Sequence, residues 1–342
     1  MGRATVHDVA KAAGVSLATI DRVLNRRGGV RAATIEKVEQ AILRLDYRRD
    51  AAAAMLAKQN EYRLAFVIPT GVNTFMRNLA AEIRRLADLA RGDRVFVSIV
   101  EVPPFDDAAL TEALERLETQ SLTGAAVVAT DNTTVRHAID RLASHGVYVV
   151  TLVSDVPSSK RAHYIGIDNS AAGRTAASLM GRFLRGESGR VAIVAGSLLL
   201  RDHAERRFGF EQVLRTEYPA LLPLPVVEGL DNAEIVEEAL GALLDAYPEV
   251  VGVYSLGAGN RGVLAALQKR GLANRVCVVA HELTAYSRAA LSDGSFAAIL
   301  NQDPGHEARS AIRILRALAD GMPIDPGQER IRIDIYLRDN LP

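Results

Sequence analysis

The chain has little of several residue types: among its 342 residues there is one cysteine, there is no tryptophan, and aromatic residues make up 5%. A single cysteine, Cys277, cannot form an intrachain disulfide, and it supplies too few thiolates for a cysteine-rich metal site. The longest apolar stretch, residues 191–200, is about half as long as a bilayer requires. Charged residues such as Arg3 and Asp8 stand where a secretory signal would be apolar. We therefore expect a cytoplasmic protein with no membrane segment and no metal centre.

Charge is unevenly distributed, although the formal net charge is zero. Residues 1–60 contain 11 Lys and Arg against 6 Asp and Glu, which is +5 and leaves 30 against 35, or −5, for the remainder. A short basic head on a larger acidic body predicts a polyanion partner for the head. Because the head is poor in aromatic residues that stack on bases, duplex DNA is favoured over single strands.

Helix signals in the head predict a helix-turn-helix. Thr5 and Asp8 have the spacing of a capping box variant at the start of a first helix. After a glycine turn, Ser16 is the expected N-cap of a second helix over 17–25, and a third is expected over 34–45. The third helix would close an apolar core over the first two.

The second helix would present a recognition surface to the major groove. Arg22 can make the bidentate contact to guanine, and its small apolar neighbours can contact thymine methyl groups. A small helical packing module with a basic, solvated surface is the alternative interpretation. The expected DNA-contacting residues of the head are Thr5, Ser16, Leu17, Ala18, Thr19, Asp21, Arg22, Asn25 and Arg26.

The segment ATVHDVAKAAGVS at residues 4–16, followed by VLN at 23–25, resembles the head of the lac repressor (LacI/GalR) family of bacterial transcription regulators. This resemblance implies a hinge helix over about 50–58 that folds on operator DNA and inserts Leu56 into the minor groove. The sequence departs from the usual hinge at Arg49, where many members have proline, and in its alanine run. Asp21 also replaces a small polar residue of the family pattern.

Beyond residue 61, apolar strand-like runs alternate with helical stretches, which predicts an α/β body with parallel sheets covered on both faces. There are too many strands for one small sheet. Two doubly wound sheets with a cleft between them resemble the periplasmic sugar-binding-protein fold that family members carry behind the head. The strands are expected at 64–68, 95–100, 125–129, 147–153, 191–195, 250–254 and 276–280, and helices at 75–90, 171–184 and 233–246.

These boundaries predict three segments and two lobes. The head occupies 1–49, the hinge and linker 50–61, and the effector-binding and dimerisation domain 62–342. Lobe 1 is expected at about 62–163 plus 296–322, and lobe 2 at about 164–295 plus 323–342.

Ligands of parallel sheets bind beyond the carboxyl ends of the strands, where this chain carries amides and carboxylates suited to a hydroxyl-rich effector. Phe75 would cover a sugar ring. Asp131 and Asp155 can equally be capping residues, and the pairs around His203 and His281 are second-line contacts or structural ion pairs. The effector residues implied by the sugar-binding pattern are Asn73, Phe75, Asp131, Ser154, Asp155, Arg206, Asn260, His281 and Gln302.

A glycine-rich loop offers a rival interpretation. Gly257, Gly259 and Gly262 fit the dinucleotide-binding fingerprint, and Glu282 follows at the distance that a ribose-binding acid requires. The fingerprint usually opens its domain, however, whereas this loop lies in the middle of the body. The glycines could instead admit a hydroxylated ligand.

The sequence therefore predicts a DNA-binding transcription regulator, not an enzyme, with no cofactor. A homodimer would bind a pseudo-palindromic operator, repress carbohydrate or polyol genes, and release DNA when a small polyhydroxylated effector binds. One alternative is a nicotinamide-dinucleotide-binding protein or enzyme that uses the loop at 257–262 and carries a DNA-binding head. The other is a constitutive DNA-binding protein whose body has lost its ligand. Effector phosphorylation, inducer against co-repressor action, and assembly beyond a dimer stay open.

Overall fold

A computed structural model describes residues 4–24, 28–47 and 60–342 of the chain. The chain divides into two compact units, Met1–Asn60 and Glu61–Pro342, which we call the head and the body. Three expected DNA contacts, Asn25, Arg26 and Leu56, lie outside the described residues, as does the expected hinge helix.

The head contains helices α1 (Val6–Ala13), α2 (Leu17–Leu24) and α3 (Ala32–Arg44). The predicted capping box is present: the Thr5 N–H donates to the Asp8 carboxylate at 2.8 Å, and the Asp8 N–H donates to the Thr5 hydroxyl at 3.3 Å. The helices enclose a small apolar core of Val9, Ala10, Ile20, Val38 and Ala41. The expected helix-turn-helix is therefore formed by local signals that lie next to one another in the sequence.

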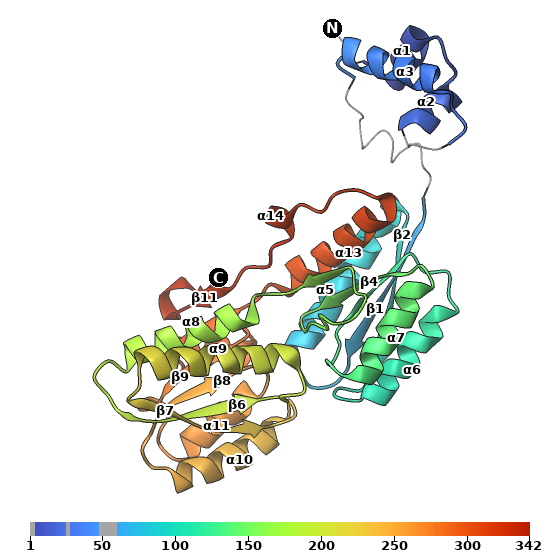
Figure 1. The fold of residues 1–342 in the computed structure, drawn as a ribbon. Helices are drawn as coiled ribbons and strands as arrows, with labels where there is room; N and C mark the ends of the chain where they lie inside the picture. Colours follow the sequence, from blue (N-terminus) through green and yellow to red (C-terminus); the bar gives the residue numbers. More distant parts are fainter. Residues whose placement is uncertain (1–3, 25–27, 48–59) are drawn as a thin grey trace. The chain divides into compact units, whose positions relative to one another are not determined.

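The body contains two largely parallel sheets with helices on both faces of each (Figure 1). The first sheet has the order β2-β1-β3-β4-β5 and the second β11-β10-β9-β8-β6-β7. Among the described strands, β11 runs antiparallel to β10 and the other pairings are parallel. The strands are β1 (Tyr62–Pro69), β2 (Val95–Val102), β3 (Gly124–Val127), β4 (Tyr148–Leu152), β5 (His163–Ile165), β6 (Gly189–Ala195), β7 (Leu221–Glu228), β8 (Val250–Ser255), β9 (Cys277–His281), β10 (Ala298–Asn301) and β11 (Asp334–Tyr336).

Helices α5 and α13 cover one face of the first sheet, and α6 and α7 cover the other (Figure 1). The second sheet lies between α8 and α9 on one side and α10 and α11 on the other. Both sheets are thus buried on both sides, as their continuous apolar strands predict. The helices are α5 (Thr74–Ala90), α6 (Asp107–Glu118), α7 (Thr133–Ser144), α8 (Asn169–Phe183), α9 (Arg201–Glu217), α10 (Ala233–Ala246), α11 (Asn260–Lys269), α12 (Ala285–Ser292), α13 (Pro304–Asp320) and α14 (Pro326–Glu329), with short 3-10 helices η1 (Arg91–Asp93) and η2 (Arg338–Asn340).

The lobe boundaries differ from the expected ones at two places. Strand β10 pairs with β9 and β11, so residues 298–301 belong to lobe 2 and not to lobe 1. The chain returns to lobe 1 only at α13, which packs against β4. Strand β5 also extends lobe 1 past residue 163.

Four strands were absent from the sequence prediction. β5 and β11 are too short to show a periodic pattern, and β10 is a brief run between two helices. β7 contains Pro223 and Pro225, and prolines in a sequence argue against a central strand. The two prolines are tolerated here because β7 lies at the edge of its sheet. No helix in residues 4–24, 28–47 and 60–342 is long and apolar enough to span a bilayer.

Candidate functional site

Helix α2 of the head has one buried and one exposed face. Ile20 is fully buried, whereas Leu17, Ala18, Asp21 and Arg22 are exposed, as predicted for a recognition surface. This face presents a guanidinium group beside small and apolar side chains, a combination that can contact base edges in a major groove.

Three other expected DNA contacts lie at helix starts. Thr5 caps α1, and the Ser16 hydroxyl accepts a hydrogen bond from the Thr19 N–H at 3.3 Å at the start of α2. The Ser16 and Thr19 hydroxyls also lie 3.0 Å apart. Helix N-termini favour anions, so these positions remain compatible with phosphate contacts.

A cavity of about 340 Å³ lies between the two lobes of the body. Its lining comes from the loops that follow strands of both sheets, which is where ligands of parallel sheets bind. Five of the nine expected effector residues line it, namely Asn73, Phe75, Arg206, Asn260 and Gln302.

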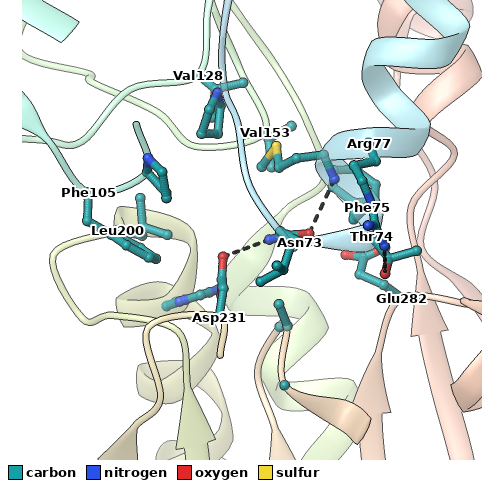
Figure 2. A pocket seen from close by; sticks show the side chains of 18 of the residues that line it. Asn73, Thr74, Phe75, Arg77, Phe105, Val128, Val153, Leu200, Asp231 and Glu282 are labelled. Carbon is teal, nitrogen blue, oxygen red and sulfur yellow. Dashed lines mark hydrogen bonds between the residues drawn. The ribbon is translucent and has the colours of Figure 1, made fainter. Parts of the chain in front are cut away.

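Part of the lobe 1 side of the cavity is apolar. Phe75, at the start of α5, lies near Val153, while Val128 and Phe105 come from the loops after β3 and β2 (Figure 2). Leu200, which precedes α9 in lobe 2, adds a further apolar side chain to the lining. These side chains offer apolar surface to a ring, and the polar Asp106, Asp107 and Thr130 of lobe 1 also line the cavity.

Asn73 joins the two lobes. Its Oδ1 accepts a hydrogen bond from the Met76 N–H at 3.2 Å, which caps α5, and its Nδ2 donates to Asp231 Oδ2 of lobe 2 at 2.8 Å (Figure 2). A second connection runs from Arg201 Nη1 to Asp131 Oδ2 at 3.1 Å. Both contacts hold the lobes in the arrangement seen here.

Arg206 is almost fully buried in lobe 2, and its guanidinium group is held from two sides. Nε donates to Asn169 Oδ1 at 2.8 Å, and Nη1 donates to the Leu256 carbonyl at 2.6 Å. The nearest carboxylate oxygens are those of Glu282, 3.9 Å from Nη1, and Asp202, 4.0 Å from Nη2. The arginine is therefore prepositioned, with its charge already balanced by acids.

Two glycines explain how Asn169 and Arg206 meet. A Cβ atom at Gly173 of α8 would lie 1.9 Å from the Arg206 carbonyl oxygen, and one at Gly209 of α9 would lie 2.1 Å from the Ser170 carbonyl oxygen. Such distances are far inside van der Waals contact. The helices therefore pack backbone against backbone, which brings the side chains at their amino ends together.

The carboxyl ends of β8, β9 and β10 contribute a chain of polar groups. Gln302 Nε2 donates to Glu282 Oε1 at 2.8 Å, and Asn260 Nδ2 donates to the His281 carbonyl at 2.8 Å. Burial raises the pKa of Glu282 to about 7. Burial also raises the pKa of Asp231, across the cavity.

The other four expected effector residues, Asp131, Ser154, Asp155 and His281, do not line the cavity. Asp131 pairs with Arg136 as well as Arg201, and Ser154 is buried after β4.

Asp155 serves its own loop instead of the cavity. Its carboxylate accepts hydrogen bonds from Arg161 Nη2 and the Thr151 hydroxyl, each at 2.6 Å. His281 is buried behind the cavity, where its Nε2 lies 2.8 Å from the Tyr254 hydroxyl, and burial lowers its pKa. Strand-end position was thus a correct guide to the loops but not to the direction of every side chain.

Asp231 and Phe105 line the cavity but were not expected there. Asp231 follows β7, the strand that its prolines concealed. Phe105 follows β2, whose position in the sequence was recognised, so the strand-end rule could have found it. Asp202, His203 and Glu282 also belong to the lining; they come from the pairs considered above as second-line contacts or structural ion pairs.

The glycine-rich loop between β8 and α11 has packing reasons for its composition. A Cβ at Gly262 would lie 2.1 Å from the Ala233 carbonyl oxygen of α10, and one at Gly257 would lie 2.5 Å from His203 Nε2. Gly259 has a φ of 110°, which favours glycine. The pattern that suggested a dinucleotide site is therefore explained by close contacts within lobe 2.

The helix-turn-helix head and the two-lobed body with its interlobe cavity define a DNA-binding regulator with a sugar-binding-like domain. Residues 5–50 match the bacterial regulatory proteins of the lacI family, and residues 64–323 match the periplasmic binding protein domain. The chain therefore carries a lacI-family head in front of a body that belongs to the periplasmic binding protein domain family. The predictions of family, of fold class and of a regulator instead of an enzyme are confirmed.

Known proteins with related sequences and structures agree with this assignment. Catabolite control protein A of Streptococcus mutans is 30% identical over 230 residues, which cover 66% of this chain and 63% of that protein, less than two thirds of its length. An ABC transporter solute-binding protein from Burkholderia graminis, solved in complex with D-arabinose, has a TM-score of 0.75 at 25% identity over 82% of this chain and 96% of its own. GanP, a glucose-galactose binding protein from Geobacillus stearothermophilus, shares the fold at a TM-score of 0.75 and 19% identity, covering 83% and 100%.

Proposed function

We propose that this protein is a cytoplasmic, homodimeric repressor of carbohydrate or polyol genes that releases a pseudo-palindromic operator when a small polyhydroxylated effector binds between the lobes. The observation that carries the proposal is the interlobe cavity, with an apolar wall on lobe 1 and the buried Arg206 among amides and carboxylates on lobe 2. Buried polar groups need partners, and a ligand with several hydroxyl groups can supply them.

The exposed face of α2 supports the DNA-binding half of the proposal. One helix-turn-helix contacts too little DNA for useful specificity, so two heads on a dimer would read two half-sites. Arg22 would contact guanine, with Leu17 and Ala18 beside it.

The two contacts between the lobes support the switching half. Asn73–Asp231 and Arg201–Asp131 stabilise one arrangement of the lobes. An effector that binds a different arrangement more tightly would shift the population toward it, by its difference in affinity for the two states. We propose that this shift changes operator affinity.

The test uses a duplex selected by the full-length protein from a random pool, with effector candidates added to the bound complex. We expect Arg206→Lys and Arg206→Ala to keep operator binding and to lose release by the sugar that releases the wild type. Arg215→Ala, an exposed position on the same helix, is the matched control and should respond like the wild type. Unchanged release in both Arg206 variants would contradict this placement of the effector.

A further inference from the structure

Among the buried side-chain atoms of the described cavity lining that have no hydrogen-bond partner, acceptors outnumber donors. Among the described lining residues, five buried acceptor atoms have no partner, against one buried donor, Arg206 Nη2. The unpartnered acceptors are Asp202 Oδ1, Asp231 Oδ1, Asn260 Oδ1, Glu282 Oε2 and Gln302 Oε1. When Glu282 holds a proton, its Oε2 becomes a second donor and the other four atoms still accept. A ligand that satisfies this wall must mainly donate hydrogen bonds.

The orientation of the Asn260 amide supports this excess of acceptors over donors. Asn260 Nδ2 donates to the His281 carbonyl, which can only accept, so the free atom of that amide is its oxygen. Gln302 is oriented in the same way by the Glu282 carboxylate, to which its Nε2 donates. Hydroxyl groups can donate to both oxygens, whereas the oxygens of a phosphate dianion can only accept.

The formal charge of the lining has the same bias. Six carboxylates line the cavity against three guanidinium groups, those of Arg77, Arg206 and Arg261. Protonation of Glu282 still leaves the acids in excess. The six are Asp106, Asp107, Asp202, Asp231, Glu234 and Glu282.

The arginines around the cavity are largely committed to protein acids. Arg261 pairs with Glu234 at 2.6 Å, and Arg206 is flanked by two carboxylates. Of its neighbours on α9, Arg201 pairs with Asp131 and Glu205, and Arg207 with Glu211 at 2.6 Å. Arg77 is exposed and donates to the Thr74 hydroxyl, so water screens its charge.

From these observations we infer that the effector is an uncharged, hydroxyl-rich sugar or polyol, and that the cavity rejects phosphorylated and carboxylated forms of the same compound. One face of the ligand lies on the apolar wall of Phe75, Val128 and Val153, and its hydroxyl groups donate to the acceptors of lobe 2. A phosphate group would face unpaired acceptors and a net negative lining, against which stand one unpartnered donor atom, Arg206 Nη2, and the water-screened charge of Arg77. The inference rests on the proposed function and narrows its ligand class.

The experiment compares each neutral compound with its own charged derivatives. Glucose, galactose, arabinose, ribose and mannitol are each tested beside their terminal phosphate esters, and the two hexoses also beside their uronates. Dye-monitored thermal unfolding of the full chain reports binding, because the chain has no tryptophan. Isothermal titration then gives the affinities. We expect a neutral compound to bind at least about tenfold more tightly than its phosphate ester.

The outcomes separate this inference from the function on which it rests. Binding of a phosphate ester or uronate as tightly as its neutral parent overturns the inference and leaves the sugar-responsive regulator in place. No stabilisation by any of the compounds overturns the proposed sugar effector itself.

A variant identifies the source of the selectivity. Asp231→Asn keeps the shape of the side chain but removes one negative charge beside the cavity, so the preference for the neutral compound should fall by about tenfold. Glu112→Gln, on the exposed surface of α6, is the matched control and should keep the full preference. An unchanged preference in Asp231→Asn would overturn the role given to the acidic lining.

Discussion

In the head, the candidate recognition residues are exposed and lie close together on α2, whereas most of the candidate effector residues of the body are buried, and they come from loops of two sheets. The head has a core of a few side chains under a polar surface, and its contacts with DNA add to an already folded unit. In the body, the residues beside the cavity also hold the lobes together. We therefore expect substitutions on the surface of the head to change DNA affinity without changing the stability of the fold. Substitutions beside the cavity should change both effector binding and the stability of the body.

The largest effect is expected where two helices of the body touch. Gly209→Ala places a methyl group against the Ser170 carbonyl, so α8 and α9 must move apart, and Asn169 must separate from Arg206. We expect a loss of about 3 kcal/mol in the free energy of unfolding, together with loss of effector binding. Urea unfolding and titration with the effector measure the two losses.

Gly92→Ala is the control for that experiment, because a Cβ at Gly92 meets no atom within 4 Å. It should leave both properties close to those of the wild type. Wild-type stability in Gly209→Ala would show that the contact between α8 and α9 tolerates a methyl group and that the two helices are not packed as closely as the Gly209 contact indicates.

A pH-dependent loss of stability is expected from Glu282. Its pKa is raised by burial from 4.5 to about 7, against the opposing influence of Arg206 and the Gln302 hydrogen bond. The folded protein therefore holds a proton that the unfolded chain releases near pH 4.5. The resulting stabilisation is complete below pH 4.5 and is lost as the pH rises through 7, by about 3 kcal/mol for this carboxyl.

Glu307 acts in the same direction, because burial and the nearby Glu282 raise its pKa well above the usual range. Denaturant unfolding of the unliganded protein between pH 4.5 and 8 measures the fall. Glu282→Gln should flatten the curve, and the exposed Glu112→Gln should not. A Glu282→Gln curve parallel to that of the wild type would show that Glu282 titrates normally.

The smallest effect is expected in the head, and it should involve affinity alone. Arg22→Ala should weaken binding to the selected operator by about 1–3 kcal/mol and leave the unfolding of the chain unchanged, because the side chain is exposed. Binding to an unrelated duplex should change little. Equal losses on both duplexes would make Arg22 a phosphate contact, and a loss of stability would remove the contrast between head and body.

The same contrast explains which features were predictable from the sequence. Thr5, Asp8 and Ser16 act on helices within three residues of themselves, so the helix starts of the head could be read locally. Helix α10 was also predicted over its observed length, since its apolar spacing and the Asn232 cap are local.

The cavity was predictable only in part. Strand ends indicate which loops meet, but the direction of a side chain depends on partners far away in the sequence. Asp155 was expected in the cavity and is instead bound by Arg161, and Asp231 was concealed by an edge strand that contains prolines. No pattern within a short window contains the hydrogen bond between Asn73 and Asp231, which are 158 residues apart.

The route of the chain between the lobes has a mechanical consequence. It crosses from lobe 1 to lobe 2 between β5 and α8, returns between β10 and α13, and crosses again between α13 and β11. Three covalent tethers oppose twisting of one lobe about the other more than they oppose bending. We therefore expect a jaw-like opening at the cavity to be the softest motion of the body, and β1, which starts at Tyr62 directly after the linker, belongs to one of the two jaws.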